Sequence, residues 1–111
     1  MTAGQSPGRL WQDYLFLTNE MDRFLAADDL DMFLDLLGQR EKLQAALDKT
    51  DTSEFKHSPA GRKIFADIVA GNAVIVQRLA KLRNQSHQRQ QVQGAYDLMT
   101  RPVGGRMDFK G

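Results

Sequence analysis

The chain of 111 residues is long enough for one domain and too short for two. Hydrophobic residues make up 41% of it and charged residues 26%, which excludes wholesale disorder, and the absence of cysteine excludes disulfides, thiolate metal sites and thiol nucleophiles. No apolar stretch is long enough to cross a bilayer, and the N-terminal residues lack the apolar core of a secretory signal, so we expect a cytoplasmic protein without membrane insertion.

The net charge of +1 conceals an uneven distribution. Residues 1–58 hold six Lys/Arg against eleven Asp/Glu, whereas residues 59–111 hold nine against three. A basic half is compatible with a nucleic acid or an acidic partner. We favour the simpler interpretation, in which acidic and basic faces of one small bundle offset each other, because no stretch is dense enough in basic residues to form a nucleic-acid-binding arm.

Two serine–proline pairs each precede a long periodic run: Ser6 stands before Pro7, and Ser58 before Pro59. A serine hydroxyl accepts hydrogen bonds from the first unpaired N–H groups of a helix, and proline at the first helical position lacks the N–H that would stay unpaired. Both pairs therefore predict helix starts.

Three runs of apolar residues at spacings of three and four predict three long helices. Asp28 or Asp29 offers an N-cap for the second run, and Gly38 inside that run is tolerated because no other helix breaker accompanies it. The three stripes are Leu10, Trp11, Tyr14, Leu17, Met21, Phe24 and Leu25; Leu30, Phe33, Leu34, Leu36, Leu37, Leu43 and Leu47; and Phe65, Ile68, Ile75, Leu79 and Leu82. Residues 48–57 show no periodicity and are predicted to form a loop.

The stretch from Arg83 to Gly94 has one apolar residue in twelve and therefore no evident face to bury. We predict that it is either a helix projecting into solvent or a fraying one. A short apolar patch follows at residues 95–99, and the chain is then broken around Pro102.

No run of alternating apolar and polar residues bounded by turn residues is present, so the sequence predicts no strand. The expected fold is all-α: an antiparallel three- to four-helix bundle with a long third helix, formed by one domain over residues 1–111. Residues 1–6 are expected to be a flexible N-terminus and residues 101–111 a flexible C-terminal tail.

The sequence contains no pattern that predicts catalysis. A glycine-rich phosphate loop and a dinucleotide fingerprint are both absent. His57 and His87 have no second histidine at helical spacing, so we interpret both as solvated residues. Asp28, Asp31 and Asp35 share a helical face, but the helix dipole favours carboxylates in a first turn without any ligand. We therefore expect no enzyme, metal, cofactor or small-molecule substrate.

The third run has two unusual features. Asn72 occupies a seam position, where a polar residue fixes the register of packed helices or contacts a ligand at the edge of a groove; we favour the register role. Val69, Val74 and Val76 lie off the seam, so the helix is apolar around much of its circumference. Either a partner helix docks on that additional face, or a further helix of the chain covers it, with residues 95–100 providing part of the cover.

Together these features resemble the FliT family of flagellar type III export chaperones over most of the chain. The residues that carry the resemblance are Trp11-Gln-Asp-Tyr14-Leu, Phe33-Leu-Asp-Leu-Leu-Gly-Gln-Arg40-Glu, Ile68-Val-Ala-Gly-Asn72, Leu79-Ala-Lys-Leu82-Arg, the Ala95-Tyr96 pair and the ending Gly105-Arg-Met-Asp108-Phe-Lys110.

The resemblance implies a small helical bundle that binds the C-terminal region of the flagellar filament cap protein before export. In some members a terminal helix partly occludes the client site, and a tyrosine of the late Ala-Tyr pair, matched here by Tyr96, docks on the flagellar export gate. Enteric members also bind a master transcription activator, which makes a transcription regulator a further implied partner. FlgN, the sibling chaperone for hook–filament junction proteins, has a similar helical outline and is the alternative.

We expect the client to lay apolar side chains into a groove between the second and third helices. Its candidate lining residues are Leu37, Ile68, Ile75, Leu79 and Leu82. Taken singly, each is more typical of a core position. Two other interpretations are a purely structural bundle and a regulator- or nucleic-acid-binding module. The latter would use Arg78, Lys81, Arg83 and Arg89.

Overall fold

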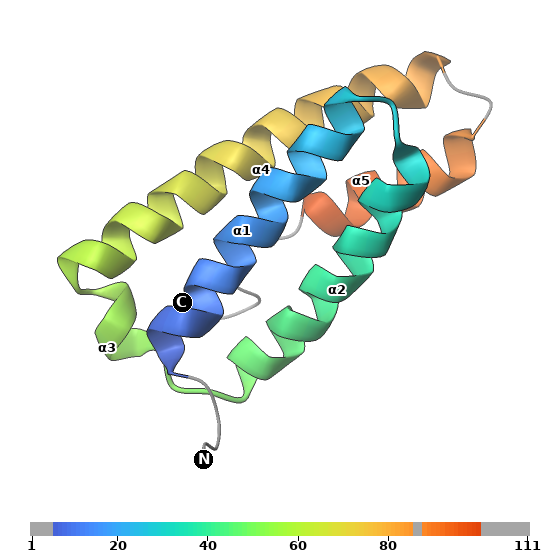
Figure 1. The fold of residues 1–111 in the computed structure, drawn as a ribbon. Coiled ribbons are helices and arrows are strands. Elements are labelled where there is room, and N and C mark those ends of the chain that lie inside the picture. Colours follow the sequence, from blue (N-terminus) through green and yellow to red (C-terminus); the bar gives the residue numbers. More distant parts are fainter. Residues whose placement is uncertain (1–5, 86–87, 101–111) are drawn as a thin grey trace.

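The computed structural model describes residues 6–85 and 88–100, and these form five α-helices without a β-strand (Figure 1). The helices are α1 (Pro7–Ala26), α2 (Leu30–Asp48), α3 (Ser53–Lys56), α4 (Pro59–Gln85) and α5 (Arg89–Met99). The predicted all-α bundle is confirmed, and its third long helix, α4, spans 27 residues. Residues 1–5 and the predicted tail at 101–111 lie outside the described residues.

Both predicted serine caps are confirmed. The Oγ of Ser6 accepts a hydrogen bond from the backbone N–H of Arg9 at 3.2 Å and starts α1. The Oγ of Ser58 accepts one from the N–H of Gly61 at 3.0 Å and starts α4. In each case the hydroxyl satisfies one N–H that has no partner within the helix.

The turn between α1 and α2 uses its two aspartates differently. Asp29 caps α2, because its carboxylate accepts a hydrogen bond from the N–H of Met32 at 3.1 Å. Asp28 has a φ of 64°, the left-handed conformation that commonly ends a helix, and the N–H of Asp29 donates back to the carbonyl of Phe24 at 2.9 Å. This tight end reverses the chain, so α1 and α2 form an antiparallel hairpin (Figure 1).

The predicted loop at residues 48–57 is wrong in part, because Ser53–Lys56 form the one-turn helix α3. Asp51 starts this turn: its carboxylate accepts hydrogen bonds from the N–H and the hydroxyl of Ser53, at 3.1 and 2.8 Å. The ring of Phe55 then packs against the apolar residues at this end of the bundle. One helical turn is too short to show a hydrophobic period, so the sequence pattern did not reveal it.

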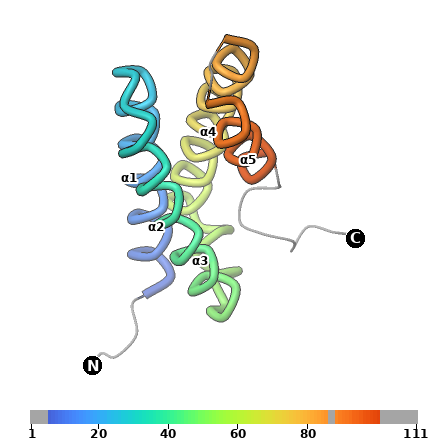
Figure 2. Tube along the Cα trace, turned by 90° about the vertical axis from the view of Figure 1, so that its right-hand side faces the viewer, coloured from blue at the N-terminus to red at the C-terminus, as the bar shows by residue number. Residues whose placement is uncertain are grey.

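Apart from the one-turn helix α3, the helices lie in two layers: α1 lies beside α2, and α4 beside α5 (Figure 2). Only residues 86–88 separate α4 from α5, so α5 folds back antiparallel along α4. The prediction that residues 83–94 have no face to bury is therefore wrong. Their one apolar residue, Val92, is fully buried together with Ala95 and Met99, because a helix of three turns needs only one apolar side chain per turn to pack.

The core consists of two apolar clusters. The basal cluster, near the start of α1, contains Leu10, Trp11, Tyr14, Leu47 and Ile68. The distal cluster, near the end of α1, contains Met21, Leu25, Phe33, Leu36, Leu37, Ile75, Leu79, Val92, Ala95 and Met99. The α5 residues belong to the distal cluster, so this helix covers only one end of the core.

A polar layer separates the two clusters. Each long helix interrupts its apolar stripe with one buried polar residue, which is Thr18 on α1, Arg40 on α2 and Asn72 on α4. In each helix, the buried apolar residues on one side of this position belong to the basal cluster and those on the other side to the distal cluster. Asn72 is thus packed inside the bundle, as the register interpretation expects.

Candidate partner-binding site

The predicted groove residues lie in the core rather than along an open groove. Leu37, Ile75 and Leu79 belong to the distal cluster and Ile68 to the basal cluster, and none is more than 3% exposed. Leu82 is half-buried at the edge of the distal cluster. The polar layer separates Ile68 from the other four, so the structure does not bring all five together. The groove is closed because α5 lies over the distal cluster.

The cover that α5 provides is one short apolar stripe. Val92, Ala95 and Met99 point into the distal cluster with exposed fractions of 0%, 2% and 2%. Their spacings of three and four place them on a single helical face. The helix has only 11 residues, and no side chain caps its first turn. Because an isolated helix of this length is marginal in water, the helical state of α5 depends on docking.

At the end of α5, Met99 reaches the polar layer. Nη1 of Arg40 donates hydrogen bonds to Oγ1 of Thr18 and Oδ1 of Asn72, both at 2.8 Å, and Nη2 donates to Sδ of Met99 at 3.1 Å. The guanidinium carbon also lies 4.6 Å from the centre of the Tyr14 ring. Arg40 therefore ties α1, α2, α4 and α5 together while being only 3% exposed. A buried cation is tolerated where polar and aromatic groups surround it in this way.

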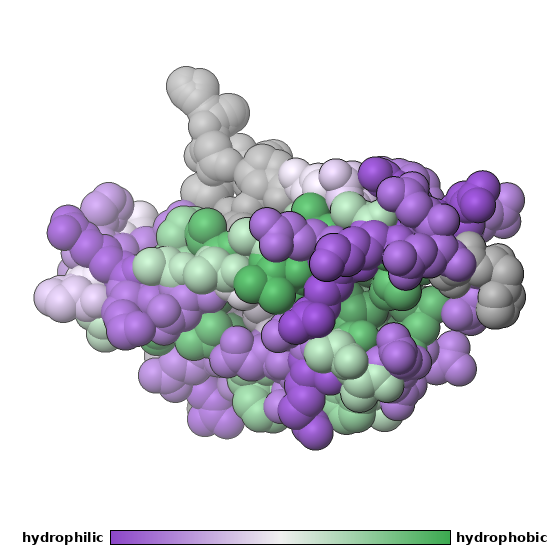
Figure 3. Space-filling view, turned by 90° about the horizontal axis from the view of Figure 1, so that it is seen from above, coloured by the Kyte–Doolittle hydropathy of each residue, from purple (hydrophilic) through white to green (hydrophobic). Residues whose placement is uncertain are grey.

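The distal cluster is not fully sealed at the N-terminal end of α5. A pocket of about 160 Å³ is lined by Leu25, Asp28, Leu30, Leu82, Gln88 and Val92. A neighbouring pocket of about 350 Å³, between the end of α1 and α4, is lined by Leu25, Ala26, Asp28, Val74, Gln77, Arg78, Lys81, Leu82 and Gln85. Seen from above, the apolar surface of the molecule is bordered by hydrophilic side chains (Figure 3). Leu82 lines both pockets, so this predicted groove residue faces open space.

Tyr96, the predicted gate-docking residue, lies on α5, half-buried against the distal cluster. The guanidinium carbon of Arg83, near the end of α4, lies 4.4 Å from the centre of its ring, a cation–π contact. Tyr96 thus joins α5 to α4 while part of its side chain stays at the surface. This position suits a packing role as well as the docking role that the resemblance implies.

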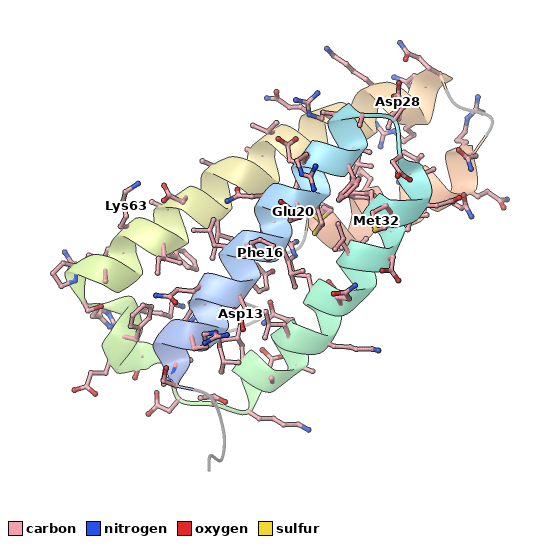
Figure 4. The ribbon with its side chains drawn as sticks, viewed as in Figure 1. Asp13, Phe16, Glu20, Asp28, Met32 and Lys63 are labelled. Carbon is pink, nitrogen blue, oxygen red and sulfur yellow. The ribbon has the colours of Figure 1, made fainter. Side chains whose placement is uncertain are left out.

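Several apolar side chains lie on the outer surface, away from the distal cluster. Phe16 on α1 and Met32 on α2 face outward from the α1–α2 layer (Figure 4). The off-seam valines of α4 divide: Val76 packs against the distal cluster, whereas Val69 and Val74 are exposed. Scattered apolar side chains are common on monomeric proteins and need no partner. The candidate partner-binding site is therefore the surface beneath α5.

The basic residues of the nucleic-acid alternative are partly engaged within the bundle. Arg78 donates a hydrogen bond to Asp22 on α1 at 2.8 Å, and Arg83 stacks on α5. Lys81 lines the larger pocket, and Arg89 begins α5. Cations that already have intramolecular partners are less available to phosphates, so this arrangement does not favour a nucleic-acid interface.

The other chemical candidates do not gather into a site. His57 is exposed, with Nδ1 at 2.7 Å from the carbonyl oxygen of Ser53, and His87 lies outside the described residues. Within residues 6–85 and 88–100, no three His, Asp or Glu side chains come close enough together to hold a metal ion. In the same ranges, no helix combines the length and the apolar character needed to cross a membrane.

Sequence reasoning missed the buried Arg40 and anticipated α5 only in part: residues 95–100 were one of two proposed covers of the third helix, but the helix begins earlier, at Arg89. A signal for Arg40 was present, because it stands three residues after Leu37, on the apolar face of α2. It interrupts that stripe as Asn72 interrupts the stripe of α4. The signal for the start of α5 was weaker, because Val92 is the one apolar residue of its stretch and shows its helical spacing only together with Ala95 and Met99.

Comparison of the chain with models of known protein families, with curated proteins and with solved structures gave no match. The fold and the site define a helical bundle whose apolar core is completed by a short terminal helix. The proposed function therefore rests on the residues of this chain and on the resemblance of its sequence to the FliT family.

Proposed function

We propose that the protein is a non-enzymatic flagellar export chaperone that binds the C-terminal helical region of the filament cap protein at the surface now covered by α5. The observation that carries this proposal is the composition of the distal cluster. Three long helices supply a broad apolar surface, and only Val92, Ala95 and Met99 of α5 complete it. A client helix with a similar stripe fits the same surface.

The energetics favour an exchange of helices at this site. The surface beneath α5 is apolar, so a bare state is costly, at roughly 25 cal/mol per Å² of exposed apolar area. A client helix that buries an equal or larger area offsets this cost. The 11 residues of α5 supply little intrinsic helix stability to oppose the exchange. The client gains shielding of its own apolar face, which is what an export chaperone has to provide.

The test uses two glycines, one on α5, the helix that covers the site, and one on α2, a long helix of the bundle. Gly94 on α5 and Gly38 on α2 are both exposed, and an added Cβ meets nothing within 4 Å at either position. Replacing a helical glycine by alanine stabilises the helix by about 0.5–1 kcal/mol. Gly94→Ala therefore favours the closed state, whereas Gly38→Ala acts on a helix that is present in the closed and the open state alike.

We expect the C-terminal segment of the filament cap protein to bind the full-length chain in isothermal titration calorimetry. Gly94→Ala raises its Kd by about two- to fivefold, because fewer molecules have the site open. Gly38→Ala leaves the Kd unchanged. A hook–filament junction protein serves as the comparison client. The proposal is contradicted if the cap segment does not bind, or if the two alanine variants bind it equally.

Docking on the export gate is tested separately through Tyr96. Truncation to alanine removes the ring beneath Arg83 and part of the edge of the distal cluster. If Tyr96 docks on the gate, Tyr96→Ala weakens binding to the cytoplasmic domain of the gate while client affinity and melting temperature change little. A large loss of melting temperature with gate binding intact assigns the residue to packing alone.

A further inference from the structure

Arg40 marks the point where any helix in the position of α5 meets the polar layer. Its Nη1 hydrogen bonds go to Thr18 and Asn72, which belong to the long helices of the scaffold. Its Nη2 hydrogen bond goes to Met99, which belongs to α5. The scaffold contacts persist when α5 is displaced, whereas the contact with Met99 is lost.

The acceptor that α5 offers is chemically weak. A thioether sulfur is a poor hydrogen-bond acceptor, whereas carboxylate and carboxamide oxygens form the strong bonds of a guanidinium. Arg40 is 3% exposed with α5 in place, so α5 and a helix that replaces it bury the arginine alike. A partner that places an oxygen at this point therefore gains a strong bond without a further cost for burying the arginine.

We propose that the partner helix that replaces α5 carries an acidic or amide side chain where α5 carries Met99. In register terms, this side chain lies seven residues after the apolar residue that replaces Val92 and four after the small one that replaces Ala95. The proposal rests on the proposed function only in assuming that a helix replaces α5. It deepens that function by naming the partner: an amphipathic helix that presents a side-chain oxygen to Arg40.

A second feature makes this position selective. α5 ends at Met99, so a carboxylate there lies in the last helical turn, where the helix dipole disfavours negative charge. A partner helix that continues past this point has no such penalty. The chain's own cover is thus limited to a weak or neutral acceptor, whereas an incoming helix can use the stronger one.

The test uses peptides that copy residues 88–100, with both ends blocked, and carry Met99→Glu, Met99→Gln or Met99→Leu. Each is titrated into the full-length chain and followed by fluorescence anisotropy. The chain's own α5 competes equally with all three peptides. The ratios of their Kd values therefore report only the effect of the side chain at position 99. We expect the Gln peptide to bind about tenfold more tightly than the Leu peptide, and the Glu peptide less tightly than the Gln peptide, because its carboxylate lies in the last turn of a helix that ends where α5 ends. Equal or tighter binding of the Leu peptide overturns the proposal.

Two further measurements isolate Arg40. In the full-length Arg40→Met chain, checked for folding by circular dichroism, the Leu peptide should bind most tightly, because the Gln and Glu side chains would then be buried without the arginine donor. In the second, Met99→Gln and Met99→Leu are placed in the chain itself, and hydrogen exchange of α5 is compared. This needs no peptide binding and no Arg40 variant. Slower exchange in the Gln variant supports the proposal, and slower exchange in the Leu variant overturns it.

These outcomes separate this inference from the proposed function. If the filament cap segment fails to bind while the peptides rank as expected, the proposed function is wrong, and the inference that Arg40 prefers a side-chain oxygen stands. If the cap segment binds and the Leu peptide is preferred, only the inference that Arg40 prefers a side-chain oxygen is wrong.

Discussion

The basal and distal clusters are built from the same three long helices, but they are closed in different ways. The basal cluster is closed by α3, which lies in the connection between α2 and α4 and packs the Phe55 ring against the cluster. The distal cluster is closed by α5, the last described helix, which is joined to the bundle at one end through residues 86–88. Under the proposed function, the basal end is a permanent scaffold and the distal end carries an exchangeable cover.

The contacts at the two closures support this division. At the basal end, Nζ of Lys56 lies 4.9 Å from the centre of the Phe65 ring and 5.8 Å from that of the Trp11 ring. The backbone carbonyl of Phe55 lies so close to Gly61 that only glycine fits there. At the distal end, by contrast, a pocket of about 160 Å³ adjoins the cover at Val92. Tight backbone packing thus fixes the basal closure, whereas the distal one is held by side-chain contacts: apolar burial, the Arg40–Met99 hydrogen bond and the Arg83–Tyr96 contact.

The largest expected effect comes from a charge beneath the cover. Leu79 is fully buried in the distal cluster, so Leu79→Asp buries an unpaired carboxylate. We expect a loss of at least about 4 kcal/mol, close to the whole stability of a small domain, and no cooperative thermal unfolding in circular dichroism. Val74→Asp, at an exposed position of the same helix, is the control and should change stability by less than about 0.5 kcal/mol. A folded Leu79→Asp chain would show that the distal cluster is not part of the core.

A smaller loss of stability is expected from adding a methyl group at the basal closure, where α3 packs against α4. A Cβ at Gly61 would overlap the carbonyl oxygen of Phe55, so α3 has to move away from α4. Gly61→Ala should lower the free energy of unfolding by about 1–3 kcal/mol in urea denaturation. The same change at Gly38, where the added carbon meets nothing within 4 Å, should raise it by about 0.5–1 kcal/mol. If both variants are equally stable, the basal closure is looser than its contacts indicate.

The smallest effect concerns the turn that starts α3. Hydrogen bonds from the hydroxyl and then the backbone N–H of Ser53 hold the pKa of Asp51 below its ordinary value of 3.8. Because the folded-state pKa is lowered, the stabilisation is present above the unfolded value and is lost as pH falls through the folded one. NMR titration of the Asp51 carboxyl should give this lowered pKa, and Ser53→Ala should move it back toward 3.8. An unchanged pKa in the variant would show that the hydrogen bonds are not the cause.

The sequence predicted the three long helices and two of their caps because those signals are local. Apolar spacing and a serine hydroxyl act within one or two turns. It did not predict α3, because one helical turn is too short to show a period, and it offered the docking of residues 95–100 only as one of two alternatives. The formation of α3 and α5 depends on tertiary contacts of Phe55 and Val92 with residues far along the chain.

The candidate site was predicted only in part, for the same reason. Leu37, Ile75 and Leu79 do share one cluster, which the periodicity indicated. Ile68 lies beyond the polar layer, and periodicity alone does not show where one apolar cluster ends and the next begins. That boundary is set by Arg40, whose polar partners come from three other helices, and a single sequence does not display such pairings.

The central claim is that α5 opens independently of the scaffold, and native-state hydrogen exchange followed by NMR tests it most directly. We expect the amides of residues 92–98 to exchange at least about tenfold faster than those of residues 68–79, because α5 opens without global unfolding. Val92→Ala should widen this difference, since it removes apolar contacts of the cover and leaves those within the scaffold. Equal protection of α5 and α4, with both falling together in the variant, would contradict the account.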